Sequence, residues 1–204
     1  MSVRLWCLRH AESENVVTRT SGAVPHAELT PRGRDQAAEA GRRLRGAGIT
    51  HVYASSAVRA ATTAEIVAGT LGLTTTLLPE LAEVGLGRAE GSQDAGVRAR
   101  TAEVLRAWVV DGALDEAVAD GEDGHAVTGR VAAALAGIAA RHDGGVVAVV
   151  GHVASLTAGL AVLCGLGGLG GRVWGAPLPH AEPFAVEGDG TAWHCGSWPA
   201  ECLM

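Results

Sequence analysis

The most constraining feature of this sequence is an unbroken apolar run, GVVAVV, at residues 145–150. Its length and its valines predict a β-strand that is buried on both faces. A second apolar run of strand length, VRLWCL at residues 3–8, predicts another strand. Strands of this kind occur in parallel sheets that carry helices on both faces, so these two runs favour an α/β fold.

The rest of the chain alternates between strand and helix patterns, as such a fold requires. Thr30-Pro31 predicts a capped helix that ends at Gly48. We expect the acidic, weakly patterned segment 94–118 to be helical and the glycine-rich segment after Cys164 to be a loop. Further strands are expected at 50–54 and 74–78 and in a hairpin of FAVE and TAWH, and further helices at 57–71, from Val127, and at 153–164. The sequence therefore predicts one domain, residues 1–204, folded as a three-layer sandwich with helices on both faces of a mostly parallel central sheet.

The basic residues restrict the chemistry that this chain can perform. All 16 are arginine, and lysine is absent. Enzymes that form a Schiff base and P-loops that depend on their lysine are therefore excluded. A phosphate site must use arginine, histidine and backbone N–H groups. The formal net charge of −6 disfavours a nucleic-acid partner, because counterion release requires a basic surface.

The longest apolar segment also bears on the cellular compartment. Residues 153–171 carry no charge over 19 positions, but five glycines follow Cys164, so a helix there is too short to span a membrane. Arg4 and Arg9 interrupt the N-terminal apolar run, which disfavours a signal peptide. We expect a cytoplasmic protein with no membrane partner. His180, His194 and Cys195 fit no common spacing of metal ligands, and we expect no metal and no cofactor.

Polar residues follow three of the predicted strands. Arg9-His10 comes after the first strand, Ser55-Ser56 after the second and Gly151-His152 after the strand at 145–150. In a sheet of this type, ligands bind beyond the carboxyl ends of the strands. The sequence therefore predicts a site that contains both His10 and His152.

Six segments in this order resemble the motifs of the histidine phosphatase (phosphoglycerate mutase-like) superfamily. They span most of the chain. They are LRHAESENV at 8–16, LTPRGRDQAAEAG at 29–41, VYASSAVRAATTAEIVA at 52–68, ELAEVGLGRAEG at 80–91, DGED at 120–123 with Arg130 downstream, and VVAVVGH at 146–152.

The resemblance implies a role for each matching residue. His10 would be the nucleophile and His152 the second catalytic histidine. Arg9 and Arg59 would bind the phosphoryl group with planar guanidinium forks. The resemblance also places Asn15 near that group.

Glu83 stands at the general-acid position of the family, where it would protonate the leaving oxygen and then deprotonate the attacking water. Glu80 and Glu90 lie in the same motif and remain alternatives for that acid.

Five residues depart from the family pattern, two of which, Gly85 and Ala89, replace an aspartate and a tryptophan of the acid motif. Ala11 replaces the glycine after the first histidine, and that glycine would serve either a close approach or a positive φ. Val153 replaces the usual glycine after the second histidine. Asp123 replaces a serine and would repel a phosphate unless an arginine neutralises it. These departures leave the substrate class and the turnover open, because they remove no catalytic side chain.

The resemblance and the strand-end histidines together predict a metal-independent phosphomonoester hydrolase with a phosphohistidine intermediate. Its partner would be a small phosphorylated metabolite, and a homodimer is kept open. The alternatives are a phosphoglycerate-type mutase, a catalytically weakened protein that binds a phosphorylated ligand, and a non-phosphatase enzyme on the same scaffold.

Overall fold

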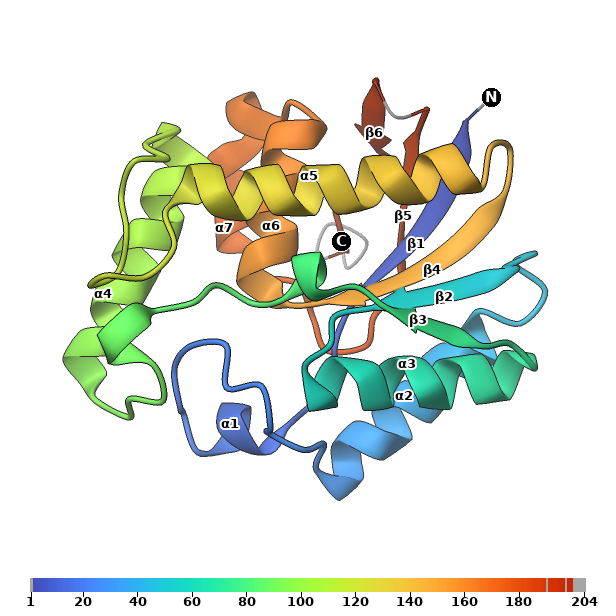
Figure 1. Cartoon of the computed structure of the whole chain (residues 1–204), viewed down its shortest axis with the longest axis horizontal. Coiled ribbons are helices and arrows are strands. Elements are labelled where there is room, and N and C mark those ends of the chain that lie inside the picture. Colours follow the sequence, from blue (N-terminus) through green and yellow to red (C-terminus); the bar gives the residue numbers. More distant parts are fainter. Residues whose placement is uncertain (1, 190, 197, 200–204) are drawn as a thin grey trace.

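The computed structural model describes residues 2–189, 191–196 and 198–199. A six-stranded mixed sheet forms its centre (Figure 1). Among the described strands three neighbouring pairs are parallel, and two, β1–β5 and β5–β6, are antiparallel. In sheet order the strands are β3 (Thr75–Leu77), β2 (His51–Ala54), β4 (Val146–Gly151), β1 (Val3–Arg9), β5 (Phe184–Gly188) and β6 (Trp193–Cys195).

Strand β4 lies inside the sheet, as its apolar run predicts. Val147 and Val149 pack into one hydrophobic cluster, whereas Ala148 and Val150 pack into another. Because side chains alternate along a strand, the two clusters lie on opposite faces of the sheet. All four residues are fully buried, which a strand with helices on both faces requires.

Helices cover both faces of the sheet and complete three layers (Figure 1). On one face α2 (Pro31–Arg43) and α3 (Val58–Leu71) supply mainly alanines to their cluster. On the other face α5 (Gly124–Arg141) and α6 (Val153–Leu163) supply Val131, Leu135, Ile138, Leu156 and Leu160. The predicted three-layer α/β fold is confirmed.

Smaller elements gather at one end of the sheet, beside the carboxyl ends of the parallel strands (Figure 1). They extend from the loops that follow the strands. These are α1 (Glu14–Val17), η1 (Pro79–Leu81), η2 (Gly87–Ala89), α4 (Ala95–Arg106), the π-helical turn η3 (Ala107–Asp111), η4 (Leu166–Leu169) and α7 (Gly170–Gly175).

Two helix ends lie well before their sequence-based expectations. Helix α2 ends at Arg43, before a turn in which Gly46 and Gly48 have positive φ. The segment expected to be helical over 94–118 is helical only to Asp111, because Gly112 adopts a left-handed conformation and ends it. The acidic stretch that follows is a loop. Its charged residues interrupt any helical apolar face, although Leu114 and Val118 pack against a hydrophobic cluster.

The glycine-rich segment after Cys164 contains α7, where a loop was expected. Gly170 explains the difference, because a Cβ on it would lie 2.3 Å from the carbonyl oxygen of Val109. The glycine lets the start of α7 contact the η3 turn directly. Val173 is buried and Trp174 packs against the same core, so tertiary contacts stabilise a helix of low intrinsic propensity. Within the described residues, no helix is long and apolar enough to cross a membrane.

Candidate active site

His10 and His152 lie side by side, directly after the ends of two adjacent strands. In the parallel register of β1 and β4, Arg9 pairs with Gly151, and the N–H of His10 donates to the carbonyl of Gly151 at 2.9 Å. His10 and His152 therefore follow the last paired residues of adjacent strands. Their ring centroids are 5.1 Å apart, and both side chains are buried. The ends of β1 and β4 thus bring these two residues together.

Arg59, in the first turn of α3, connects the two rings. Its Nε donates to Nε2 of His10 at 3.1 Å, and its Nη2 lies 3.1 Å from Nδ1 of His152. A third contact, from Nη1 to the carbonyl oxygen of Val24, fixes the guanidinium. Arg59 is 1% exposed, so this cation lies within the protein.

These contacts assign the proton positions of both rings. Because a guanidinium only donates, Nε2 of His10 and Nδ1 of His152 are acceptors. The proton of His10 is then on Nδ1, which donates to the carbonyl of Ala11 at 2.7 Å. The proton of His152 is on Nε2, which donates to Oγ of Ser55 at 2.8 Å. His10 thus presents an unprotonated Nε2 to the site.

Burial keeps both histidines neutral. It is the main cause that lowers the pKa of His10 well below its ordinary value, and the Arg59 and Arg9 cations lower it further. Burial likewise dominates the lowered pKa of His152, with contributions from His10 and Arg59. A neutral imidazole beside two arginines is suited to nucleophilic attack on an anionic substrate.

Arg9, the last residue of β1, adds a second cation. Burial lowers its pKa to about 10, an effect that the Glu83 carboxylate opposes and Arg59 reinforces. Its Nη1 donates to the carbonyl of Leu178 at 3.1 Å, whereas its buried Nε has no hydrogen-bond partner. A buried N–H donor without a partner is costly, and a bound anion would satisfy it.

Glu83 belongs to the segment between η1 and η2, and its side chain lies against the start of α6. Its carboxylate accepts from three backbone N–H groups: those of Val84 at 3.0 Å, Ser155 at 2.9 Å and Ala154 at 3.2 Å. The last two belong to the first turn of α6, which directly follows His152. The helix terminus therefore holds this carboxylate next to the histidine pair.

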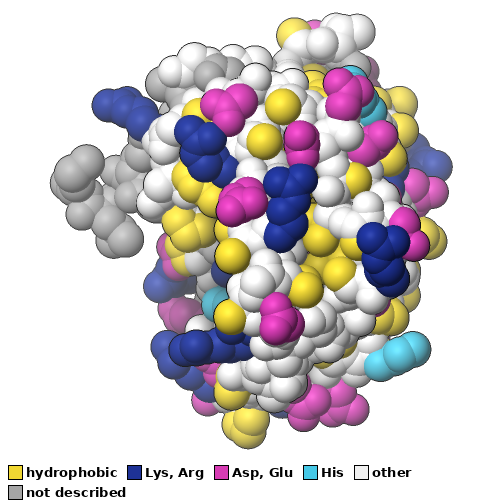
Figure 2. All heavy atoms as spheres, turned by 90° about the vertical axis from the view of Figure 1, so that its left-hand side faces the viewer, with side chains coloured by type: hydrophobic (Ala, Val, Ile, Leu, Met, Phe, Trp, Pro, Cys, Tyr) yellow, Lys and Arg dark blue, Asp and Glu magenta, His cyan; other side chains and the backbone are white. Residues whose placement is uncertain are grey.

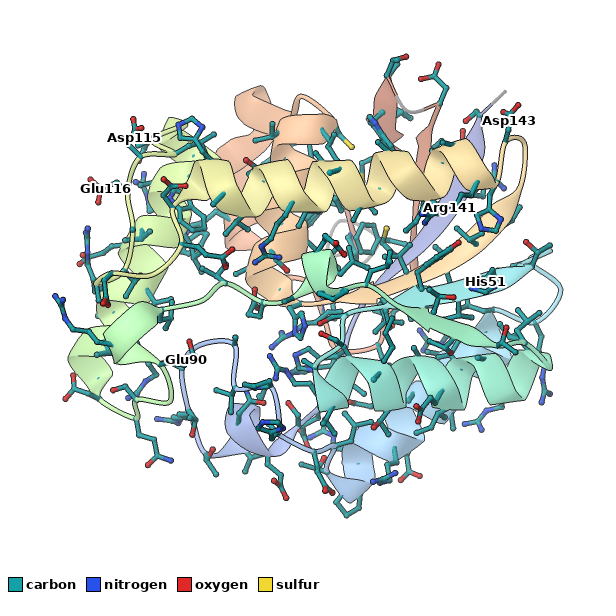
Figure 3. All side chains as sticks on the ribbon, viewed as in Figure 1. His51, Glu90, Asp115, Glu116, Arg141 and Asp143 are labelled. Atoms are coloured by element: carbon teal, nitrogen blue, oxygen red, sulfur yellow. The ribbon has the colours of Figure 1, made fainter. Side chains whose placement is uncertain are left out.

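The two alternative carboxylates in this motif have different surroundings. Glu80 is exposed. Glu90 accepts from the N–H of Val24 at 2.8 Å and from that of Leu86 at 3.0 Å, so it ties two loops together. Figure 3 places Glu90 at the site end of the sheet and His51, Arg141 and Asp143 at the opposite end. The geometry thus favours Glu83 over its neighbours.

An ion pair supports the segment that carries Glu83. Arg130 of α5 bonds Glu122 through Nε at 2.8 Å and Nη2 at 2.9 Å. It also donates to the carbonyl oxygens of Glu80, Ala82 and Glu83. In the DGED motif, Glu122 is thus the partner of Arg130.

The segment 29–41 holds the loop that follows His10. Thr30 caps α2 by accepting from the N–H of Gly33, and Oε1 of Gln36 accepts from the N–H of Glu12 at 2.9 Å. A Cβ on Gly33 would lie 2.0 Å from the carbonyl oxygen of Glu12. Thr30 also donates its N–H to the carbonyl of Glu12 at 3.1 Å, so three residues of one motif fix the backbone two residues after His10.

The structure accounts for two departures from the family pattern. Ala11 does not have a positive φ, so a positive φ was not what this position requires. It is fully buried, and its N–H donates to Oγ1 of Thr63 at 3.1 Å. Asp123 is the N-cap of α5 and accepts from the N–H of Ala126 at 2.8 Å. A helix cap thus explains an aspartate at this position.

Asn15 is the predicted site residue that the structure connects least to the others. It lies in α1, half-buried, and its Oδ1 accepts from Oγ of Ser13 at 2.7 Å. Within the described part of the chain, no hydrogen bond joins Asn15 to His10, Arg9 or Arg59.

Sequence reasoning missed His180. Its Nδ1 donates to the carbonyl of His10 at 2.9 Å, and the two ring centroids are 5.6 Å apart. His180 precedes β5 and follows no strand, so neither its position nor its spacing indicated this contact. Ser55, in contrast, could have been assigned from its place at the end of β2. Among the described residues, no group of three or more His, Cys, Asp or Glu side chains is placed to hold a metal ion.

Comparisons with known proteins agree with this geometry. A protein named Probable phosphoglycerate mutase GpmB, from Citrobacter koseri, is 30% identical over 164 residues, which cover 80% of this chain and 76% of that protein. The solved structure of Bacillus stearothermophilus YhfR is 28% identical, with a TM-score of 0.80 and 95% of each chain covered. The mycobacterial glucosyl-3-phosphoglycerate phosphatase is 25% identical, with a TM-score of 0.80 over 98% of this chain and 100% of that one.

A family model decides the relationship. The model of the histidine phosphatase superfamily, branch 1, matches residues 5–200, nearly the whole chain. This match includes each segment on which the resemblance was based, and it confirms the predicted family and enzyme class. The chain belongs to branch 1 of the histidine phosphatase superfamily.

Proposed function

We propose that this chain hydrolyses a small phosphorylated metabolite without a metal ion, through a phosphohistidine on His10. The unprotonated Nε2 of His10 carries the proposal. It lies in a buried site that Arg9 and Arg59 make cationic, and its orientation is fixed by the hydrogen bond from Nδ1 to Ala11. This arrangement combines a nucleophile with donors for phosphate oxygens.

The first step forms a nitrogen–phosphorus bond. Phosphate oxygens take over the N–H groups of Arg59, and the unpaired Nε of Arg9 gains an acceptor. The Nε2 lone pair of His10 then attacks phosphorus, and the bond between phosphorus and the leaving oxygen breaks. Protonated Glu83 gives its proton to that oxygen, so the leaving group departs as a neutral alcohol.

The second step reverses these proton movements. The Glu83 carboxylate takes a proton from water, the resulting hydroxide attacks phosphorus, and the nitrogen–phosphorus bond breaks. Its electron pair returns to Nε2, so His10 is again neutral and Glu83 again protonated. His152 would support the phosphoryl group, because the Nε2–H that it donates to Ser55 can turn to a phosphate oxygen.

A phosphoglycerate-type mutase is the second candidate, because relatives with 30% identity are named as such. A mutase must retain a bisphosphorylated intermediate, which needs a second anion site. Two of the α4 arginines are already neutralised, Arg100 by Glu116 at 2.6 Å and Arg106 by Asp111 at 2.7 Å. In Figure 2, basic and acidic side chains alternate over this end of the molecule. Both observations favour hydrolysis over the phosphoryl transfer of a mutase.

The proposal is tested with the purified chain and two substrates. We expect phosphate release from p-nitrophenyl phosphate in the presence of EDTA. With 3-phosphoglycerate, we expect no isomerisation that outpaces phosphate release, with or without 2,3-bisphosphoglycerate. Loss of activity on chelation with rescue by a divalent ion would contradict the histidine mechanism. Isomerisation faster than hydrolysis would establish the mutase instead.

A further inference from the structure

A cavity of about 470 Å³ lies directly beside the proposed acid. Val153 and Ala154 form part of its wall, and the N–H of Ala154 bonds the Glu83 carboxylate. Ser21 and Gly22 form another part, and the same loop includes Val24, whose carbonyl accepts from Arg59. The cavity therefore adjoins the residues that hold Glu83 and Arg59, on the Glu83 side of the histidine pair.

The wall of this cavity is mostly apolar. It is built from α4, the η3 turn, the start of α6, and α7, which lie together at one end of the sheet (Figure 1). The apolar contributions come from Leu105, Val109, Val153, Val173 and Trp174. A volume of this size suits a small organic molecule. A polyhydroxylated or multiply charged group would lose hydration against these side chains without replacement.

One polar group within this wall has no partner. Thr157, on the second turn of α6, is 7% exposed, and its Oγ1 makes no hydrogen bond in the described structure. A buried hydroxyl without a partner is destabilising, so a ligand that supplies one would bind better once the Thr157 side chain rotates toward the cavity. Arg98, the charged residue of the wall, donates to the carbonyl of Gln93.

We propose that this cavity selects the leaving group, and that the substrate is a phosphomonoester of a largely apolar, ring-containing alcohol with one hydrogen-bonding group for Thr157. This inference rests on the proposed phosphatase function. Val153 is central to it, because glycine at this position would leave the wall without an apolar side chain next to His152. The departure at residue 153 thereby becomes a determinant of specificity.

The first experiment compares kcat/KM for acetyl phosphate, phenyl phosphate and 1-naphthyl phosphate. In Ala102→Phe, a ring from α4 fills the cavity, and Ala102 is exposed, so folding tolerates the change. Ala99→Phe is the matched control, since Ala99 is exposed on the same helix and is not part of the wall. Ratios of variant to wild-type kcat/KM cancel the intrinsic reactivity of each substrate.

We expect Ala102→Phe to lower kcat/KM for 1-naphthyl phosphate about tenfold or more, because burial of a second ring is lost. Acetyl phosphate, whose leaving group is too small to fill the cavity, should retain its wild-type kcat/KM within about twofold. Ala99→Phe should leave all three substrates unchanged. An equal loss for all substrates, or no loss for naphthyl phosphate, would overturn the assignment of the cavity.

The second experiment examines the hydroxyl of Thr157. Among the ring-nitrogen isomers of quinolinyl phosphate, we expect at least one to exceed 1-naphthyl phosphate in kcat/KM by about fivefold, and Thr157→Val to abolish that preference. A preference that survives in Thr157→Val would show that the Thr157 hydroxyl does not bond the ring nitrogen.

The two proposals fail in different ways. Hydrolysis of acetyl phosphate by the wild type, combined with a preference for 3-phosphoglycerate over naphthyl phosphate, would contradict the apolar leaving group and leave the phosphatase intact. If none of these phosphorylated compounds were hydrolysed, the phosphatase function itself would be contradicted.

Discussion

The two halves of the site are built in different ways. The phosphoryl half consists of Arg9, His10 and His152 at strand ends, with Arg59 at the start of α3, and every one of these side chains is largely buried. The leaving-group half consists of short helical elements around a cavity, and its residues are mostly apolar. The first half is fixed by the parallel register of the sheet, and the second by how loops and short helices pack.

This difference separates chemistry from selectivity. A phosphoryl group needs charged donors at fixed positions, and a rigid sheet edge supplies them. The leaving group differs among substrates, and elements outside the sheet can change without disturbing the strand ends. We therefore expect substitutions in the phosphoryl half to lower kcat/KM for all substrates. Substitutions in the leaving-group half should lower kcat/KM for some substrates and not for others.

Among variants that keep the nucleophile, the largest effect is expected at the boundary between the halves, at Glu83. Glu83→Gln should lower kcat for alkyl phosphates by about 10²–10⁴-fold, because their leaving oxygen needs a proton. The loss should be far smaller for p-nitrophenyl phosphate, whose leaving group is stable as an anion. Steady-state rates over a series of leaving groups measure this dependence.

Glu90→Gln serves as the control, since Glu90 ties two loops and does not contact the histidine pair. We expect no dependence on the leaving group in this variant. If Glu90→Gln showed the steep dependence and Glu83→Gln did not, the assignment of the acid would be wrong.

A smaller effect is expected from the contact that fixes the loop after His10. Gly33→Ala places a Cβ against the carbonyl of Glu12, and the displacement should lower the free energy of unfolding by about 1–3 kcal/mol. It should also lower kcat for every substrate, because His10 lies two residues before the displaced Glu12. Urea unfolding and kinetics on the same samples test both effects.

Gly69→Ala is the matched control within α3, because nothing lies within 4 Å of a Cβ there. We expect it to raise stability by up to about 1 kcal/mol and to leave kcat unchanged. Equal stability of Gly33→Ala and wild type would show that the contact with Glu12 is not tight.

The smallest effect concerns pH. The folded pKa of His152 lies below its ordinary value of 6.5, mainly through burial. Below pH 6.5 the unfolded chain therefore binds a proton that the folded chain does not, and stability falls as pH falls. Each such histidine contributes a slope of at most roughly 1.4 kcal/mol per pH unit.

The measurement compares unfolding free energies of wild type and His152→Asn between pH 7.5 and 5.5. We expect the variant to lose part of the acid dependence, whereas carboxylates common to both proteins cancel in the difference. An identical pH dependence in both would mean that His152 accepts a proton in the folded state as readily as in the unfolded chain.

The same division explains what could be predicted from the sequence. His10 and His152 follow apolar runs, so a strand pattern alone predicted that they meet, and the family motifs added Arg59 and Glu83. His180 could not be predicted, because it reaches His10 through an isolated pairing of Arg9 with His180 beside the sheet. The cavity could not be predicted either, because it depends on the left-handed end of η3 at Gly112 and on the contact that Gly170 permits.

The central claim is that His10 carries the phosphoryl group, and rapid acid-free quenching followed by mass spectrometry tests it most directly. Wild type mixed with excess 1-naphthyl phosphate should show one phosphate on the peptide that contains His10, stable to alkali and labile to acid. The adduct should be absent in His10→Ala, which should also release no phosphate above background. Phosphate release by His10→Ala at the wild-type rate, or a stable adduct on another residue, would contradict the claim.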